Sequence, residues 1–151
     1  MLAVAAVIAT LGAAPASAQH VNLQPTYGTI TLRTGFEPDP TVVAVQSGGN
    51  INANTINSSC AGFIADAPDV RLQFTAGSLP LIISVASQSD TTLIVNGPDG
   101  RWYCDDDGGQ NMNPSLRFDH AASGQYDIWI GTYGASSLQN AQLNVSELTS
   151  Q

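Results

Sequence analysis

The stretch from Asp90 to Gly109, with the sequence DTTLIVNGPDGRWYCDDDGG, constrains the fold more than any other part of the chain. It contains an apolar run, an Asn-Gly-Pro-Asp-Gly segment, a second short apolar run and three adjacent aspartates. Gly, Pro, Asn and Asp tolerate positive φ or preset a turn. The stretch therefore predicts a β-hairpin that ends in an acidic loop.

Alternation of apolar and polar residues recurs along the rest of the chain, each time bounded by turn residues. Successive side chains of a strand point to opposite faces, so each apolar set marks one buried face. These sets are Ile30 and Leu32; Val70, Leu72 and Phe74; Leu81, Ile83 and Val85; Leu93 and Val95; Trp102 and Cys104; Leu116 and Phe118; Tyr126, Ile128 and Ile130; Leu143 and Val145. About eight or nine strands follow, which predicts an all-β antiparallel sandwich. The segment 48–59 is either an exposed loop or a short edge strand.

The first residues are typical of a secretory signal peptide. An apolar run is followed by Ala16-Ser17-Ala18, which predicts cleavage after Ala18 and a secreted or periplasmic protein. A membrane anchor is the alternative, but the run is short for a bilayer and contains Gly12 and Pro15. No Lys or Arg precedes the run, which suggests that the true start lies upstream. Residues 19–151 are expected to form one domain, with no membrane insertion once residues 1–18 are removed.

The net charge narrows the class of partner. Asp and Glu total 12 against 4 basic residues, which gives a formal charge of −8, and the chain contains no lysine. This charge disfavours nucleic acid and anionic membranes as partners and attracts divalent cations or cationic proteins. It also serves simply to keep an exported domain soluble.

Cys60 and Cys104 are the two cysteines of a chain expected in an oxidising compartment, so we predict that they form a disulfide. Closing a loop of that size stabilises a fold by about 4 kcal/mol in the chain-entropy model, less any strain. Zinc is disfavoured because two thiols with His20 and His120 show no recognisable ligand spacing.

Several short motifs follow one another in order between Gly28 and Leu148. They are Asp69 to Phe74, Ala76-Gly77, Leu81 to Val85, Asp90 to Val95, Pro98 to Gly100, Asp105 to Gly109, Ser123 to Tyr126 and Tyr133-Gly134. In this order they resemble the bacterial pre-peptidase C-terminal domain, a small β-sandwich found beside secreted proteases and in other exported proteins. The resemblance implies a jelly-roll-like sandwich and, in some relatives, calcium binding and attachment to protein or polysaccharide. The absence of a protease domain, the cysteine pair and the segment from Glu37 to Pro40 depart from that pattern.

The acidic loop is the candidate metal site. Calcium takes six to eight oxygen ligands, which carboxylates, amides and backbone carbonyls supply. The candidate ligands are Asp90, Asp105, Asp106, Asp107, Asn111 and Asn113. Their spacing does not match an EF-hand, so the alternative is a solvated loop in which an Asp caps a turn.

Three aromatic residues are candidates for a carbohydrate- or polymer-binding surface: Trp129, Tyr103 and Tyr133. Aromatic rings offer a large flat contact area with a polar edge. Trp129 alternates with Ile128 and Ile130, so it points away from the core if they point inward. The alternative is that Trp129 packs under a loop or against a neighbouring strand.

No catalytic motif is evident. A Gly-x-Ser-x-Gly elbow and a metalloprotease helix motif are absent, and the adjacent Asp119 and His120 point to opposite faces of a strand. The sequence thus predicts a secreted, calcium-stabilised, non-catalytic binding or structural module that attaches to an unidentified extracellular protein or polysaccharide. The alternative is a carbohydrate- or matrix-binding or self-assembling surface protein without a metal site, because sheet edges without lysine are open to pairing between chains.

Overall fold

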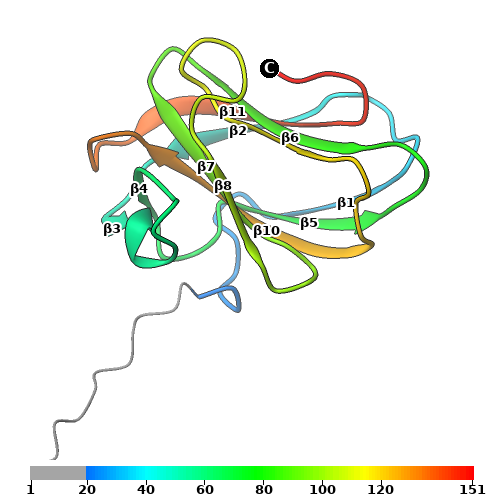
Figure 1. The fold of residues 1–151 in the computed structure, drawn as a ribbon, viewed down its shortest axis with the longest axis horizontal. Helices are drawn as coiled ribbons and strands as arrows, with labels where there is room; N and C mark the ends of the chain where they lie inside the picture. Colours follow the sequence, from blue (N-terminus) through cyan, green and yellow to red (C-terminus); the bar gives the residue numbers. More distant parts are fainter. Residues whose placement is uncertain (1–19) are drawn as a thin grey trace, which may run out of the picture.

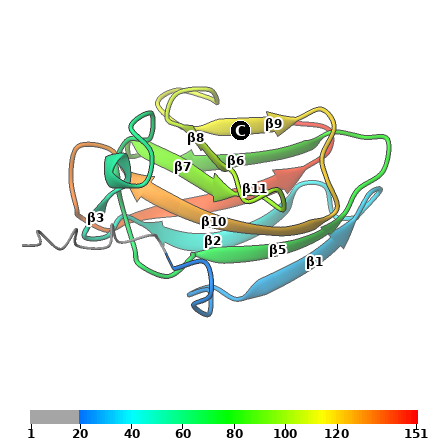
Figure 2. The same cartoon turned by 60° about the horizontal axis from the view of Figure 1, so that its bottom comes forward.

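The computed structural model describes residues 20–151, which form two β-sheets packed face to face (Figure 1, Figure 2). The predicted all-β sandwich is confirmed, with eleven strands and one 3-10 helix among the described residues. The predicted signal peptide lies outside them. The elements are β1 (Thr29–Arg33), β2 (Thr41–Ser47), β3 (Ile51–Asn52), η1 (Ala53–Thr55), β4 (Phe63–Ile64), β5 (Val70–Thr75), β6 (Leu81–Ser87), β7 (Thr91–Asn96), β8 (Trp102–Asp105), β9 (Ser115–Phe118), β10 (Gly124–Thr132) and β11 (Gln139–Ser146).

One sheet has seven strands and the other has four. In the seven-stranded sheet, β10 pairs with β5 and β4 along one side and with β7 along the other; β1 lies beyond β5, β8 beyond β7 and β3 beyond β4. The four-stranded sheet has the order β2-β11-β6-β9. All pairs are antiparallel except β1 with β5.

The strand count exceeds the predicted eight or nine because three strands carry weak sequence signals. β2 has the sequence TVVAVQS, a nearly continuous apolar run rather than an alternation of apolar and polar residues. It follows the segment from Glu37 to Pro40, in which both X-Pro peptide bonds are cis. β3 and β4 have two residues each, too few for a pattern of alternation. The segment 48–59 therefore contains a short edge strand followed by η1, as one of the two sequence interpretations allowed.

The main core lies between the sheets and consists of the inward-facing sets that the alternation predicts, except Trp102 and Cys104, which pack in a second core on the opposite face of the seven-stranded sheet. Leu72, Ile83 and Ile128 are fully buried in the main core, and Tyr126 donates its hydroxyl proton to the carbonyl oxygen of Ala122 at 2.8 Å. Burying side chains of this size is the dominant favourable contribution to folding, at about 25 cal/mol per Å² of apolar surface.

A second core lies on the opposite face of the seven-stranded sheet. Ile94 and Trp129 project from that face, and the segment from β3 to β4 covers them with Ala53, Cys60 and Ile64. Cys60 is bonded to Cys104 of β8, which confirms the predicted disulfide and ties the covering segment to the sheet. The sandwich thus has a third layer on one side.

The side chain of Asp69 takes the place of a missing strand partner in the seven-stranded sheet. On the same side of β10, Ile128 pairs with β5 and Thr132 pairs with β4, which leaves the N–H of Ile130 without a strand partner. The carboxylate of Asp69 accepts that N–H at 2.7 Å. Burial raises the pKa of Asp69 to about 7, although the bond from Ile130 acts in the opposite direction.

The C-terminal residues fold back over part of the outer face of the four-stranded sheet. The backbone N–H of Gln151 donates to the Ser84 hydroxyl at 3.1 Å, and Ser150 donates to the Ser115 hydroxyl at 2.7 Å. Ser84 is therefore buried, although it points away from the main core. On the rest of that face, the outward side chains of β2 and of the first half of β11, among them Ala44, Asn140 and Gln142, stay exposed.

Candidate functional site

In the acidic loop, a carboxylate accepts hydrogen bonds from nearby backbone N–H groups, and no recognisable set of metal ligands is formed. Asp105, at the end of β8, accepts the backbone N–H of Gly108 at 2.7 Å and that of Ser115 at 2.8 Å through one carboxylate oxygen. This is the turn-capping role that the solvated-loop interpretation assigns to an Asp in this loop. Asp106 and Asp107 follow it in the loop, between β8 and β9.

The other candidate calcium ligands are divided between the loop surface and the protein interior. Burial raises the pKa of Asp90, and the charges of Asp107 and Asp106 raise it further, so these three carboxylates lie within electrostatic reach of one another. Asn113 is buried; its amide accepts from the Thr91 hydroxyl at 2.7 Å and donates to a backbone carbonyl of β6 at 2.8 Å. Asn111 is exposed, in a turn with positive φ.

The fit of these residues to calcium is poor. Within residues 20–151, no group of three or more His, Cys, Asp or Glu side chains is arranged to hold a metal ion. Asn113 is committed to joining β6 and β7, and Asp105 is committed to two backbone N–H groups. Calcium binding by this loop stays a prediction for which the structure offers no ligand set.

Trp129 does not offer its ring to a ligand. Its side chain is 0% exposed, its ring centroid lies 5.3 Å from that of Trp102, and its indole N–H donates to the Asp66 carbonyl at 3.4 Å. The parity argument correctly places it opposite the main core, but the disulfide-tied segment covers it. An exposed binding role for Trp129 is thus wrong for this conformation, and the alternative of packing under a loop holds.

Tyr103 packs against the main core from β8, level with the middle of β10, whereas Tyr133 follows the last residue of β10. Tyr103 donates its hydroxyl proton to the Asp99 carboxylate at 2.7 Å, and its ring packs edge-on against Phe118. Both the hydroxyl and the ring are therefore already in contact with the protein. The pKa of Tyr103 is raised, chiefly by that hydrogen bond. Tyr133 follows β10 directly and is half exposed.

His120 and Asp119 do not interact as a catalytic pair. The Asp119 carboxylate accepts from the Arg117 guanidinium at 2.7 Å, and His120 is exposed at the end of β9. Arg71 forms the most buried ion pair of the described residues, with Asp127 at 2.7 Å, and also donates to the carbonyls of Val21 and Leu23. That pair anchors the N-terminal segment and is structural.

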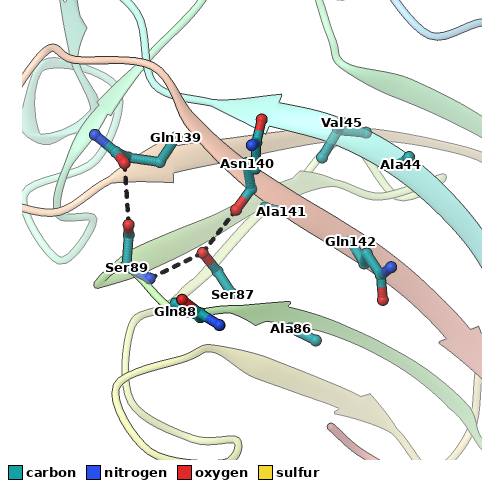
Figure 3. A pocket seen from close by; sticks show the side chains of 10 residues that line it. All are labelled: Ala44, Val45, Ala86, Ser87, Gln88, Ser89, Gln139, Asn140, Ala141 and Gln142. Atoms are coloured by element: carbon teal, nitrogen blue, oxygen red, sulfur yellow. Dashed lines mark hydrogen bonds between the residues drawn. The ribbon is translucent and has the colours of Figure 1, made fainter.

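A depression lies on the uncovered part of the four-stranded sheet (Figure 3). We call it the sheet hollow; it has a volume of about 810 Å³. Residues from β2, β11, β6 and the turn after β6 line it, and none of them carries a charge. The lining residues are Ala44, Val45, Ala86, Ser87, Gln88, Ser89, Gln139, Asn140, Ala141 and Gln142.

Local hydrogen bonds fix one end of the sheet hollow. The Ser87 hydroxyl donates to the Asn140 carbonyl at 2.9 Å, and the Ser89 hydroxyl donates to the Gln139 side-chain oxygen at 3.1 Å (Figure 3). The side-chain amides of Gln88, Asn140 and Gln142 have no hydrogen-bond partner within residues 20–151. Sequence reasoning missed this site, because its residues come from strands far apart in the chain.

The chain matches no known protein family and no curated protein. A solved structure with a partial likeness is Aeromonas hydrophila PliG, a periplasmic lysozyme inhibitor of g-type lysozyme. The two chains are 14% identical with a TM-score of 0.43, and the likeness covers 78% of this chain and 96% of the other. A score at that level supports no functional argument. No helix of residues 20–151 is long and apolar enough to cross a membrane.

Proposed function

We propose that this chain is an exported, non-catalytic binding module that holds a neutral, hydroxyl-rich ligand, an oligosaccharide or a segment of polysaccharide, in the sheet hollow. The observation that carries the proposal is the row of unpartnered side-chain amides on the uncovered sheet face, Gln88, Asn140 and Gln142. The volume of the sheet hollow, about 810 Å³, falls in the range of small-molecule and cofactor sites.

The chemistry of the lining favours hydroxyl groups. A side-chain amide both donates and accepts hydrogen bonds, as a sugar hydroxyl does. Ala44 and Ala86 lie on either side of Gln142, their cross-strand neighbour, and their small side chains leave room for a ligand to lie flat on the sheet. A ligand in the hollow therefore meets both polar partners and a smooth floor.

The electrostatics of the chain point the same way. The lining has no carboxylate or basic group, so an ionic ligand finds no counter-charge there. The net charge of −8 repels anionic polymers from the molecule as a whole. Because no titratable side chain lines the hollow, it lacks a general acid, a general base and a nucleophile with an adjacent base, which supports binding without turnover.

Titration of the exported chain with neutral oligosaccharides of several linkages, followed by isothermal calorimetry, tests the proposal. We expect saturable binding to at least one of them, without release of shorter products. The double variant Asn140→Ala/Gln142→Ala should weaken that binding about tenfold or more, since each lost hydrogen bond contributes on the order of 1 kcal/mol.

Gln46→Ala provides the matched control. Gln46 is a glutamine on the same outer face of β2, exposed and outside the lining of the hollow, so its truncation should leave the affinity unchanged. Absence of binding to any neutral oligosaccharide, or equal losses in the control and the double variant, would refute the proposed ligand class.

A further inference from the structure

The outer side of β2 is an unpaired sheet edge. β2 pairs with β11 only. Gln46 donates its backbone N–H to the Tyr27 hydroxyl at 2.9 Å, which shows that the N–H of Gln46 points away from β11. Alternate residues of a strand share that direction, so the N–H groups of Val42 and Ala44 also point outward. Neither of them has a partner among residues 20–151.

This edge lacks the charges with which proteins usually guard an edge strand. β2 has the sequence TVVAVQS, without a charged residue, and Val42 is 48% exposed. The other long edges differ: β1 ends in Arg33, β8 ends in Asp105, and β9 contains Arg117. Two copies with a charge of −8 repel each other. A neutral strand is where they can approach with the least local repulsion.

We propose that β2 is a self-association edge, which pairs antiparallel with β2 of a second copy about a two-fold axis with Val43 opposite Val43. In this register Val42 of each copy lies opposite Ala44 of the other, and the two residues exchange their free N–H and C=O groups. The pairing spans Thr41 to Val45 and leaves the Gln46 N–H to Tyr27.

The pairing makes one continuous sheet from the four-stranded sheets of two copies. A two-fold axis between antiparallel strands runs perpendicular to their sheet, so both copies present the same face. The two sheet hollows, each of which includes Ala44, would then lie side by side on one extended surface. The association goes beyond the proposed ligand and does not depend on it.

A cysteine scan tests both the association and its register. Val43 residues facing one another in a non-hydrogen-bonded pair have Cα atoms about 4.5 Å apart, within the range that a disulfide spans. Val43→Cys should give a covalent dimer under mild oxidation. Val42→Cys is the matched control, because two positions of offset separate its Cα atoms by about 8 Å, which is too far for a bridge. Equal cross-linking of both variants, or none in Val43→Cys, would overturn the register.

Sedimentation equilibrium of the unmodified exported chain and of Val42→Lys tests the association without an added thiol. Lysine on an edge strand places two like charges beside each other in the paired state, so we expect the dimer dissociation constant to rise at least tenfold. Val42→Thr, which is uncharged and suited to a strand, should retain the dimer. A chain that stays monomeric up to millimolar concentration would refute the proposal, and oligosaccharide binding by that monomer would leave the proposed function intact.

Discussion

The side chains on the two outer faces of this sandwich follow the same rule of alternation, but one face is covered by another segment of the chain and the other is exposed. On the seven-stranded sheet, the outward residues Ile94 and Trp129 are apolar, and a disulfide-tied segment covers them. On the four-stranded sheet, the outward residues Ala44, Asn140 and Gln142 are small or polar, and they stay uncovered as the sheet hollow. Alternation therefore tells which face a side chain occupies, whereas its polarity and the neighbouring loops decide whether water or a ligand reaches it.

Among the variants that test this comparison, Trp129→Ala should cause the largest loss of folding stability. Removing a fully buried tryptophan leaves a cavity under the covering segment, and we expect a loss of about 3 to 5 kcal/mol in the free energy of unfolding. Urea denaturation measures it. A loss below about 1 kcal/mol would mean that Trp129 is not packed as described and would restore it as a candidate for ligand contact.

Replacing both cysteines by serine should have a slightly smaller effect. Without the bond between Cys60 and Cys104 the covering segment is held only by its packing, and a stabilisation of about 2 to 4 kcal/mol should be lost. The double variant and the reduced unmodified chain should unfold at similar urea concentrations. Affinity in the sheet hollow should not change in folded protein, because the hollow lies on the other sheet; a parallel loss of affinity would show that the two faces are coupled.

Folding stability should depend on pH, whereas ligand affinity in the sheet hollow should not. Asp69 has a folded-state pKa of about 7 against an ordinary value of 3.8, so its protonated form favours the folded state. Its contribution is complete at acid pH and is lost as the pH rises through 7, which predicts lower stability at pH 8 than at pH 5. Asp69→Asn keeps an oxygen for the Ile130 N–H but cannot ionise, so its stability should vary less over that interval.

Chemical denaturation of both chains at intervals from pH 5 to pH 8 measures this difference. The sheet hollow has no titratable lining residue, so ligand affinity should stay constant over the same range. Parallel stability profiles for the two chains would show that Asp69 does not carry the effect.

The sequence predicted most of the sandwich, since the eight alternating sets all lie in strands and the disulfide pairs as expected. It did not predict β2, because TVVAVQS is a nearly continuous apolar run without the alternation that marks the predicted strands. It could not predict the cover over Trp129, since burial on an outer face depends on where the segment around Cys60 returns. Alternation alone places Ala44, Asn140 and Gln142 on an outward face, which is a weak sequence signal for the sheet hollow. That β2 and β11 lie side by side follows only from their pairing in the structure.

A map of backbone amide chemical shifts in residues 19–151, recorded during titration with a neutral oligosaccharide that the chain binds, tests the proposed site most directly. We expect changes confined to the uncovered face, at residues 44–45, 86–89 and 139–142, with no change on the covered face around Trp129. Changes centred on Tyr103, Tyr133 or the acidic loop, with the sheet hollow silent, would contradict the proposed site.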